Sequence, residues 1–417
     1  MAILHEAMMN CSYATTTDKH RIKPELNRLL RRELRRQGID DLGVLPPPRA
    51  KPVMAVVLDW WNTAHAMFRC YSRLVAACRP HFRMVAVSTY PASTDRDAMA
   101  LFDDVIEFGN WPYDIPDELR RRLPAIAGLA PDVVYYPAIG IGLTGLFLSN
   151  LRLAPLQVAT LGHPATPGTR FIDRVLPFPE FHGGDAAFEE ELHLLPAGCV
   201  SFVPSPAALP EPWPEAPADE ESEGRVNIAV SAYLLKLNPL FLGACKAIGD
   251  AARTPTRFHF FVGGGRGIAY LAARRAIRQF LPDAVVHPYR HYGAYTSRLA
   301  RCAMFLSPFP FGNTNGIVDC VRLGIPGVCL FGEQPHAAID RGMFRIAGLP
   351  EDLVAYSTAA YVAAAAGLAD DAPRRAALRR ELLGRDLDAL LGTGRAEGFA
   401  ETVIEIMGRR LSPGPSP

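Results

Sequence analysis

The sequence of 417 residues lacks an excess of charge of either sign. It holds 44 lysines and arginines against 43 aspartates and glutamates, so the formal net charge is +1. Domains that bind nucleic acid usually carry a clustered basic excess, so the composition does not favour a nucleic-acid partner. The chain also lacks a secretory leader and any apolar run of about 18 residues, the length that a membrane-spanning helix needs. We therefore expect a cytoplasmic protein with no membrane span.

Paired cysteines and several well-known catalytic motifs are also missing. The eight cysteines are scattered, with no C-x-x-C pair and no spacing typical of a metal site. Several lie within apolar runs, so we expect buried thiols in a reducing compartment. The sequence has no H-E-x-x-H, no G-x-S-x-G and no Walker A pattern. These absences exclude the commonest metalloprotease, hydrolase and P-loop chemistries.

What the sequence does have is apolar residues, which make up 49% of the chain and are ample for large buried cores. Residues 1–38 read as helical, with a leucine stripe at Leu26, Leu29, Leu30 and Leu34. The other faces carry five arginines: Arg28, Arg31, Arg32, Arg35 and Arg36. A basic amphipathic helix can lie on a membrane, but we favour a solvated face on a packed helix. A proline-rich connector then completes residues 1–50.

Short apolar strands alternate with helices through residues 51–203. The expected strands are 53–58, 84–88, 104–108, 132–136 and 156–161. A second series fills residues 225–417, with expected strands 226–231, 258–262, 284–287, 304–306 and 327–330 and closing helices 372–391 and 396–408. The proline-rich, acidic stretch 204–224 between them reads as a linker. The alternation predicts an α/β protein of two domains, each a parallel sheet covered on both faces.

The most informative local pattern is Phe305–Asp319, where an apolar strand runs through a proline- and glycine-containing turn into a helix start. Asn or Thr there would cap free backbone N–H groups, and the positive end of the helix dipole favours an anion. Asp319 lies one helical turn after Asn315, so both side chains face the same way. A carboxylate there suits a ribose better than a phosphate. An ordinary capped strand-loop-helix junction explains the same pattern.

Two glycine-rich segments follow predicted strands. Gly140–Gly145 matches G-x-G-x-x-G, but it follows the fourth strand of its domain and lacks an acidic residue about twenty positions on. We therefore do not expect a nicotinamide or flavin cofactor there. Gly263–Gly267 could approach a pyrophosphate, with Arg266 as a countercharge. A plain tight turn explains that segment equally well.

Five blocks of the sequence resemble one enzyme family and occur in that family's order. They are Leu161–Thr166, Leu235–Pro239, Phe305–Asp319, Gly324–Leu330 and Gly332–His336 with Ile339-Asp340. The family is the bacterial cytoplasmic N-glucosyltransferases of high-molecular-weight adhesins, in glycosyltransferase family 41 with the protein O-GlcNAc transferases. The resemblance implies the glycosyltransferase-B fold, in which two Rossmann-like domains face a cleft. It also implies a short N-terminal helical remnant where family members carry a larger helical domain.

The resemblance implies a metal-independent, inverting transfer from UDP-glucose, or another UDP-hexose, to asparagine in Asn-x-Ser/Thr of an adhesin-like protein. It implies that His163 and Lys236 are catalytic. Lys236 would contact the β-phosphate, and His163 would orient the diphosphate or donor sugar or handle the acceptor proton. The implied UDP-sugar contacts are Lys236, Tyr292, Thr314, Asn315, Gly316 and Asp319.

Four further residues are candidates near the cleft: Arg266, His287, His336 and Asp340. The last two lie four apart on a helix, either as an orienting pair or as a helix-surface pair. Two D-x-D pairs, Asp95-Arg-Asp97 and Asp386-Leu-Asp388, are not expected at the cleft, so we expect neither a metal ion nor another cofactor. Two alternatives stay open: O-linked transfer to Ser or Thr, and a truncated, catalytically silent relative that binds a UDP-sugar.

Overall fold

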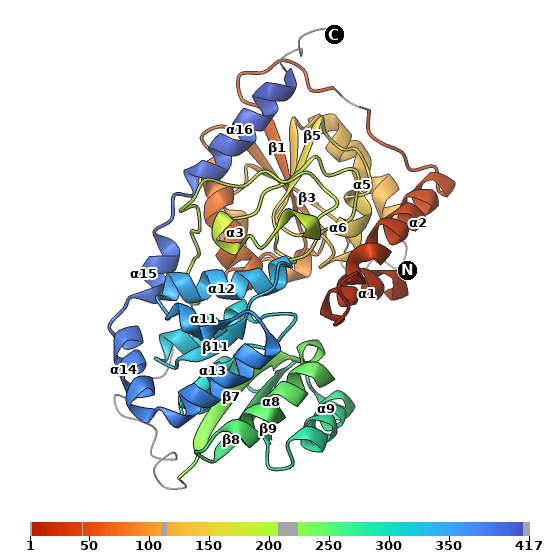
Figure 1. Cartoon of the computed structure of the whole chain (residues 1–417). Helices are drawn as coiled ribbons and strands as arrows, with labels where there is room; N and C mark the ends of the chain where they lie inside the picture. Colours follow the sequence, from red (N-terminus) through yellow and green to blue (C-terminus); the bar gives the residue numbers. More distant parts are fainter. Residues whose placement is uncertain (1, 44, 110–114, 207–223, 412–417) are drawn as a thin grey trace.

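The computed structural model describes residues 2–43, 45–109, 115–206 and 224–411 of the chain. It has two α/β lobes, one from each half of the sequence (Figure 1). Most of the predicted linker 204–224 lies outside the described residues. The division of the chain at the predicted residue numbers therefore stays a prediction.

The first lobe is built on a six-stranded parallel sheet in the order β3-β2-β1-β4-β5-β6. Its strands are β1 Val53–Leu58, β2 Arg83–Ser88, β3 Asp104–Glu107, β4 Val133–Tyr136, β5 Leu156–Ala159 and β6 Arg174–Val175. Its helices are α3 Ala66–Cys78, α4 Arg96–Met99, α5 Ile115–Leu129 and α6 Leu143–Leu148. All six residues of β1 are buried, as expected for a central strand whose two faces are both covered by helices.

The second lobe repeats this plan in the order β12-β11-β10-β7-β8-β9. Its strands are β7 Val226–Tyr233, β8 Thr256–Gly263, β9 Val285–His287, β10 Met304–Leu306, β11 Gly327–Leu330 and β12 Val354–Ala355. The helices that follow these strands are α8 Pro239–Ala251, α9 Gly267–Phe280, α10 Tyr292–Leu299, α11 Thr314–Arg322, α12 Pro335–Ala347 and α13 Thr358–Asp370. The predicted pair of parallel-sheet lobes is confirmed.

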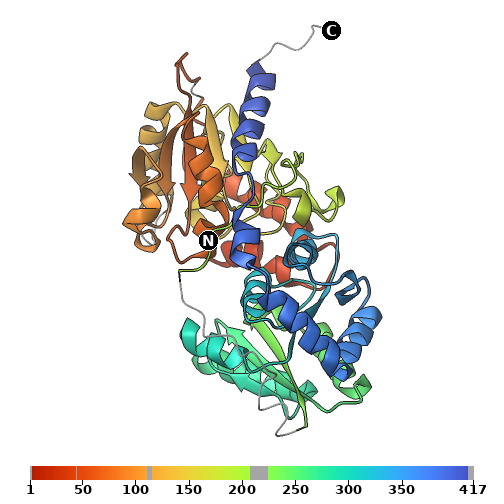
Figure 2. The same ribbon diagram turned by 90° about the vertical axis from the view of Figure 1, so that its left-hand side faces the viewer.

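The closing helices differ from the prediction. The expected helix 372–391 is two helices, α14 Ala372–Leu383 and α15 Leu387–Gly392, because the Asp386 carboxylate caps a new helix start at the Ala389 N–H, 2.9 Å away. The last helix, α16 Glu397–Leu411, then returns to the first lobe (Figure 2). Its Phe399 packs on Tyr135 of β4, with ring centroids 4.8 Å apart. Helix α16, near the end of the sequence, thus packs against the first lobe and stabilises it.

The N-terminal part is helical as predicted, and it contains two α-helices, α1 Ala2–Asn10 and α2 Ile22–Arg36. The predicted leucine stripe is partly wrong: Leu30 and Leu34 are buried, but Leu29 is 44% exposed. Where α2 packs on the first lobe, the buried side chains of Lys23, Asn27 and Arg31 take the place expected for Leu29. Lys23 and Asn27 donate to carbonyls of residues 166–168, and Arg31 donates to the Asn150 carbonyl. Hydrophobic periodicity could not reveal this, because hydrogen bonds to the first lobe satisfy these buried polar groups.

In the part of the chain that the structure describes, no helix is both long enough and apolar enough to cross a membrane.

Candidate functional site

A cavity of about 280 Å³ lies in the second lobe where β7, β8 and β9 end. Ligands of parallel α/β sheets usually bind outside the carboxyl ends of the strands. The lining brings together His287, Tyr292, Asn315, Gly316 and Asp319, which the sequence separates by up to 32 positions. Five of the predicted site residues therefore share one cavity, which is called the second-lobe pocket below.

The start of α11 forms one wall of this pocket. Asn313 holds the cap position, but its side chain makes no capping hydrogen bond, so the predicted side-chain cap is wrong. The Asn313 amide instead donates to the Ser231 carbonyl and accepts from the Lys236 ammonium at 3.1 Å. A side chain at Gly316 would collide with that amide. Because no side chain caps the first N–H groups of α11, this helix end keeps its affinity for an anion.

Asp319 lies one turn further along α11 and is largely buried. Burial raises the pKa of its carboxyl, and hydrogen bonds from Tyr292 and Tyr295 oppose that rise. The Tyr292 hydroxyl donates to the carboxylate at 2.6 Å. Asp319 therefore joins α11 to α10 and also faces the pocket, so the geometry suits both a ribose contact and a packing role.

His287 and Arg266 occupy the far side of the pocket in different ways. The His287 ring stacks on Phe261, with centroids 4.4 Å apart and planes 9° from parallel, and burial lowers its pKa to about 4. It is therefore a neutral, flat wall at physiological pH. Arg266 does not line the pocket, but Tyr289 does. The Arg266 guanidinium stacks over the Tyr289 ring, 4.2 Å from its centroid.

Lys236 lies between this pocket and the cleft. Its ammonium donates to the Gly312 carbonyl at 2.6 Å and lies 5.0 Å from the Phe311 ring centroid. Burial lowers its pKa to about 8, and the nearby Asp340 carboxylate opposes that fall. The ammonium is thus charged at neutral pH, although burial makes the charge costly. An anionic ligand would relieve that cost.

A second cavity, of about 180 Å³, lies between the lobes and shares Asn313 and Asn315 with the second-lobe pocket. It is called the interlobe cavity. Lys236 and Thr314 line it from the second lobe. From the first lobe it is lined by the start of α3 and by the loop after β5, including Gly162 and Pro164. A ligand that passes the start of α11 can therefore extend from one cavity into the other.

His336 and Asp340 lie on α12 and are each 1% exposed, so the helix-surface interpretation is wrong. Their side chains also have different partners. His336 stacks on Phe311 at 4.7 Å, and its Nε2 lies 3.0 Å from the Lys19 ammonium. Asp340 accepts the Asn313 N–H at 3.1 Å, and burial raises its pKa to about 6. His336 thus contacts the N-terminal segment, and Asp340 holds the turn before α11.

His163 lies in the loop after β5, between the two residues that line the interlobe cavity. The side chain is buried, and its Nε2 lies 3.0 Å from the Ser12 hydroxyl. Burial, and then the neighbouring Lys23 charge, hold the pKa of His163 well below its usual range. The imidazole is therefore neutral at physiological pH. Its Nδ1 has no hydrogen-bond partner among the described residues.

The segment between α1 and α2 is the part of the site that the sequence analysis missed. Tyr13 stacks on Phe311 with ring centroids 4.4 Å apart, while Ser12 and Lys19 contact the two histidines named above. The signal was the polar run Thr15–Asp18, since such residues favour caps and turns over helix interiors. The N-terminal segment thus contacts both lobes at the cleft.

The G-x-G-x-x-G segment cannot hold a dinucleotide in this structure. The Asp59 carboxylate accepts the Gly142 N–H at 2.9 Å, and a side chain at Gly142 or Gly145 would collide with it. A carboxylate therefore fills the space where a pyrophosphate would lie.

The D-x-D pairs have structural partners. Asp95 and Asp386 cap α4 and α15, and Asp388 pairs with Arg322 at 3.1 Å. Among the described residues, no group of three or more His, Cys, Asp or Glu side chains is placed to hold a metal ion. The absence of a metal from the reaction stays a prediction.

Two enzymes are similar to this chain along most of its length. The UDP-glucose:protein N-beta-glucosyltransferases of Actinobacillus pleuropneumoniae serotypes 5b and 7 are each 36% identical to the chain over 412 residues. The chain is similar to protein N-glucosyltransferases along 97% of its length. The resemblance inferred from the five blocks is therefore confirmed. The chain spans 65% of the length of these relatives.

Two further comparisons agree. A family model described as HMW1 domain 2 matches residues 1–34. A mutant of the Thermobaculum terrenum O-GlcNAc transferase superposes with a TM-score of 0.71 at 19% identity, covering 98% of this chain and 76% of its own. The predicted glycosyltransferase-B fold, with short N-terminal helices, is confirmed.

Proposed function

We propose that this chain is a UDP-sugar-dependent protein glycosyltransferase. It transfers glucose to the side-chain amide of asparagine in Asn-x-Ser/Thr by an inverting, metal-independent reaction. The observation that carries the proposal is the junction of the two cavities at Asn313 and Asn315, beside the Lys236 ammonium. The donor and acceptor are those named for the 36% identical relatives, together with the sequon that the resemblance implies.

In this proposal the second-lobe pocket holds the uridine. Tyr292 forms its wall, and Asp319 accepts hydrogen bonds from the ribose. The diphosphate lies at the start of α11, where the uncapped N–H groups and the Lys236 charge favour an anion. The glucose then extends into the interlobe cavity, against the loop that carries His163.

The transfer forms a bond from the amide nitrogen to the anomeric carbon and breaks the bond from that carbon to the diphosphate oxygen. The electron pair leaves with UDP, and the amide nitrogen loses one proton, which is released to solvent. Lys236 stabilises the negative charge that develops on UDP. His163 is neutral at physiological pH, so it can make a hydrogen bond at the opposite wall without carrying a charge.

A UDP-release assay with an Asn-x-Thr peptide, across several UDP-sugars, tests the proposal. We expect release that requires both substrates, is fastest with UDP-glucose and persists in EDTA. Mass spectrometry of the product distinguishes asparagine from O-linked Ser or Thr modification. Calorimetric binding of UDP without turnover would instead identify a silent relative, and loss of activity in EDTA that Mn²⁺ restores would disprove metal independence.

A further inference from the structure

A larger cavity, of about 790 Å³, shares no lining residue with the second-lobe pocket or the interlobe cavity. It lies between α2 and two loops of the first lobe, around Asn150 and Thr169. Four arginines of α2 line it: Arg28, Arg31, Arg32 and Arg35. Their spacing of three to four residues puts them on one face of the helix. Arg170 adds a fifth guanidinium from the loop.

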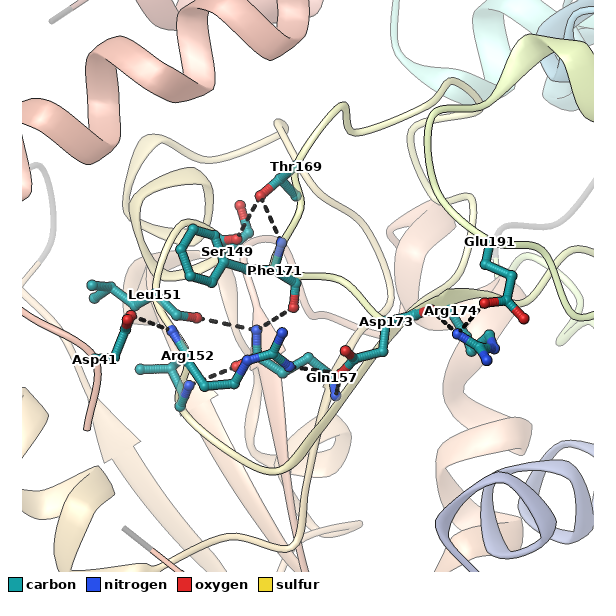
Figure 3. Close-up of polar contacts among 11 residues, drawn as sticks. Asp41, Ser149, Leu151, Arg152, Gln157, Thr169, Phe171, Asp173, Arg174 and Glu191 are labelled. Carbon is teal, nitrogen blue, oxygen red and sulfur yellow. Dashed lines mark hydrogen bonds and ion pairs between the residues drawn. The ribbon is translucent and has the colours of Figure 1, made fainter. Parts of the chain in front are cut away.

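A network of hydrogen bonds holds the loop that lines this arginine cavity (Figure 3). The buried Gln157 amide donates to the carbonyls of Leu151 and Phe171, at 3.1 and 2.8 Å. The Thr169 hydroxyl donates to the Ser149 carbonyl at 3.1 Å. Asp173 accepts the Gln157 N–H at 2.8 Å. The loop that presents Thr169 to Ile172 is therefore fixed before any ligand arrives, which lowers the entropic cost of binding.

Most of the positive charge in the cavity is not neutralised. Arg32, Arg35 and Arg170 form no ion pair with the described residues, and Arg28 pairs only with the exposed Glu25. Arg31 is 8% exposed and pairs with Asp41 at 2.8 Å, yet its Nε is buried without a hydrogen-bond partner. Exposed ion pairs contribute little, so these cations are available to a ligand.

One aromatic ring contributes an apolar surface. The guanidinium groups of Arg31 and Arg170 lie 4.9 and 5.3 Å from the centroid of Phe171. Cation–π contacts hold both groups in place beside the ring. The cavity thus combines ordered cations with an apolar face.

Three glutamates, Glu189, Glu190 and Glu191, also line the cavity, and they restrict the class of ligand that it can bind. Glu190 accepts hydrogen bonds from Thr166 at 2.7 Å and from the Thr169 N–H at 3.0 Å, and Glu191 pairs with Arg174 at 2.7 Å. Glu189 lines the cavity without a cation partner among the described residues. These carboxylates would repel a nucleic acid or an anionic membrane, whose exposed groups are densely anionic. A polypeptide offers side-chain carboxylates to the arginines and backbone N–H groups to the glutamates.

We propose that the arginine cavity binds an acidic segment of a polypeptide. From Arg28 to Arg35 the helix rises about 10 Å, which three residues of extended chain span at about 3.3 Å each. The volume also lies within the range of about 300–1,000 Å³ typical of ligand sites. This identification rests on the proposed function: the segment is part of the acceptor protein and binds outside the two cavities in which the sugar is transferred. The cavity then acts as a second attachment point that raises the local concentration of sequons.

Fluorescence anisotropy with two labelled peptides of equal length, one rich in Asp and Glu and one rich in Asn and Gln, tests this. The full chain should bind the acidic peptide, with an affinity that falls as salt rises. The combined variant Arg32→Gln, Arg35→Gln, Arg170→Gln should bind it at least about tenfold more weakly, the effect of losing about 1.4 kcal/mol. The matched control Arg274→Gln, Arg275→Gln, Arg278→Gln, which removes three charges from α9, should bind it as the parent does. Thermal unfolding at the parental Tm shows that the variants are folded.

Equal binding of both peptides, or equal binding by the parent and the cavity variant, would overturn the proposal. So would binding to vesicles containing phosphatidylserine without binding to the acidic peptide, because that result would place α2 on a membrane. The peptide-binding test of the cavity and the test of the proposed function can fail independently of each other. If no sugar is transferred but the cavity variant loses peptide binding, the cavity assignment holds and the transferase assignment fails. If a short sequon peptide is modified but no acidic peptide binds, the reverse is true.

Discussion

The two walls of the cleft are built differently. On the second-lobe side, the predicted residues converge on a pocket whose shape comes from strand ends and the start of one helix. On the first-lobe side, His163 lies on a loop that hydrogen bonds from helix α2 hold in place. Lys23 of α2 donates to the Thr166 carbonyl at 2.8 Å, and Asn27 donates to that of Gly168 at 2.7 Å. In the proposed function the second lobe therefore binds the nucleotide by itself, whereas the first lobe needs the N-terminal segment to place its histidine.

This difference suggests a division of labour, with donor binding on the second lobe and the transfer step completed by the first. Each variant below is expected to change one side of that division.

The largest effect should come from His163→Ala. A group that assists proton transfer or orientation in the transition state contributes about 10²–10⁴-fold, so kcat should fall by that order. UDP affinity should stay within about twofold of the parent, because removing an interaction made only in the transition state spares ground-state binding. Kinetics and calorimetry on the same preparation check this, with His81→Ala, an exposed histidine of the same lobe, as the control. A Kd that rises in step with the loss of kcat would make His163 a binding residue and contradict the division of labour between the lobes.

Lys236→Ala should lower turnover by about 10²-fold or more, the scale for removing one group that stabilises developing charge. UDP should also bind more weakly, because the ammonium lies at the proposed diphosphate position. The measurement is steady-state turnover together with thermal unfolding to confirm the fold. Lys246→Ala on α8, where the lysine is exposed and pairs with Asp250, should leave both constants unchanged. Near-parental turnover of Lys236→Ala would remove Lys236 from the mechanism.

Asp319→Asn should weaken UDP binding by about tenfold, since hydrogen bonds to a charged group contribute about 1.5–3 kcal/mol. Calorimetry measures the affinity, and Tyr292→Phe serves as the companion variant because it removes one of the two hydrogen bonds from α10 to Asp319 and leaves the carboxylate. Unchanged affinity together with a lower Tm for Asp319→Asn would show that the carboxylate supports packing rather than the ribose.

The affinity for UDP should also depend on pH. Burial places the pKa of Lys236 at about 8, so its ammonium is charged below that pH and increasingly neutral above it. The Asp340 carboxyl, with a pKa of about 6, is already ionised there and remains constant. UDP affinity should therefore begin to fall as the pH approaches 8 and fall more steeply above it, approaching tenfold per pH unit. In Lys236→Arg the decline should disappear, because arginine stays charged; a decline that persists would have another cause.

Much of the fold could be predicted because each lobe repeats a strong local pattern. Strands such as β1 are continuous apolar runs, and parallel sheets require them. The strands that were missed, β6 and β12, are two residues long, too short to show any period. The break before α15 depends on one capping aspartate, and helix boundaries of that kind are rarely visible in a hydrophobic pattern.

The candidate site was predictable only in part. Asn315, Gly316 and Asp319 are neighbours on one helix, so their shared pocket follows from the spacing. The role of Asn313 did not follow, because its amide is used across the lobe by Ser231 and Lys236 instead of by its own helix. Contacts between Tyr13 and Phe311, almost 300 residues apart, leave no local trace in the sequence at all.

Amide hydrogen exchange with and without UDP would test the division of labour most directly. The first N–H groups of α11 lack intrahelical partners, so they should exchange quickly in the free chain. We predict that UDP slows exchange at residues 287–292 and 313–319 and leaves residues 161–166 unchanged until an Asn-x-Thr peptide is added as well. Protection by UDP alone that is confined to residues 161–166 would contradict the account, because it would place the nucleotide on the first lobe.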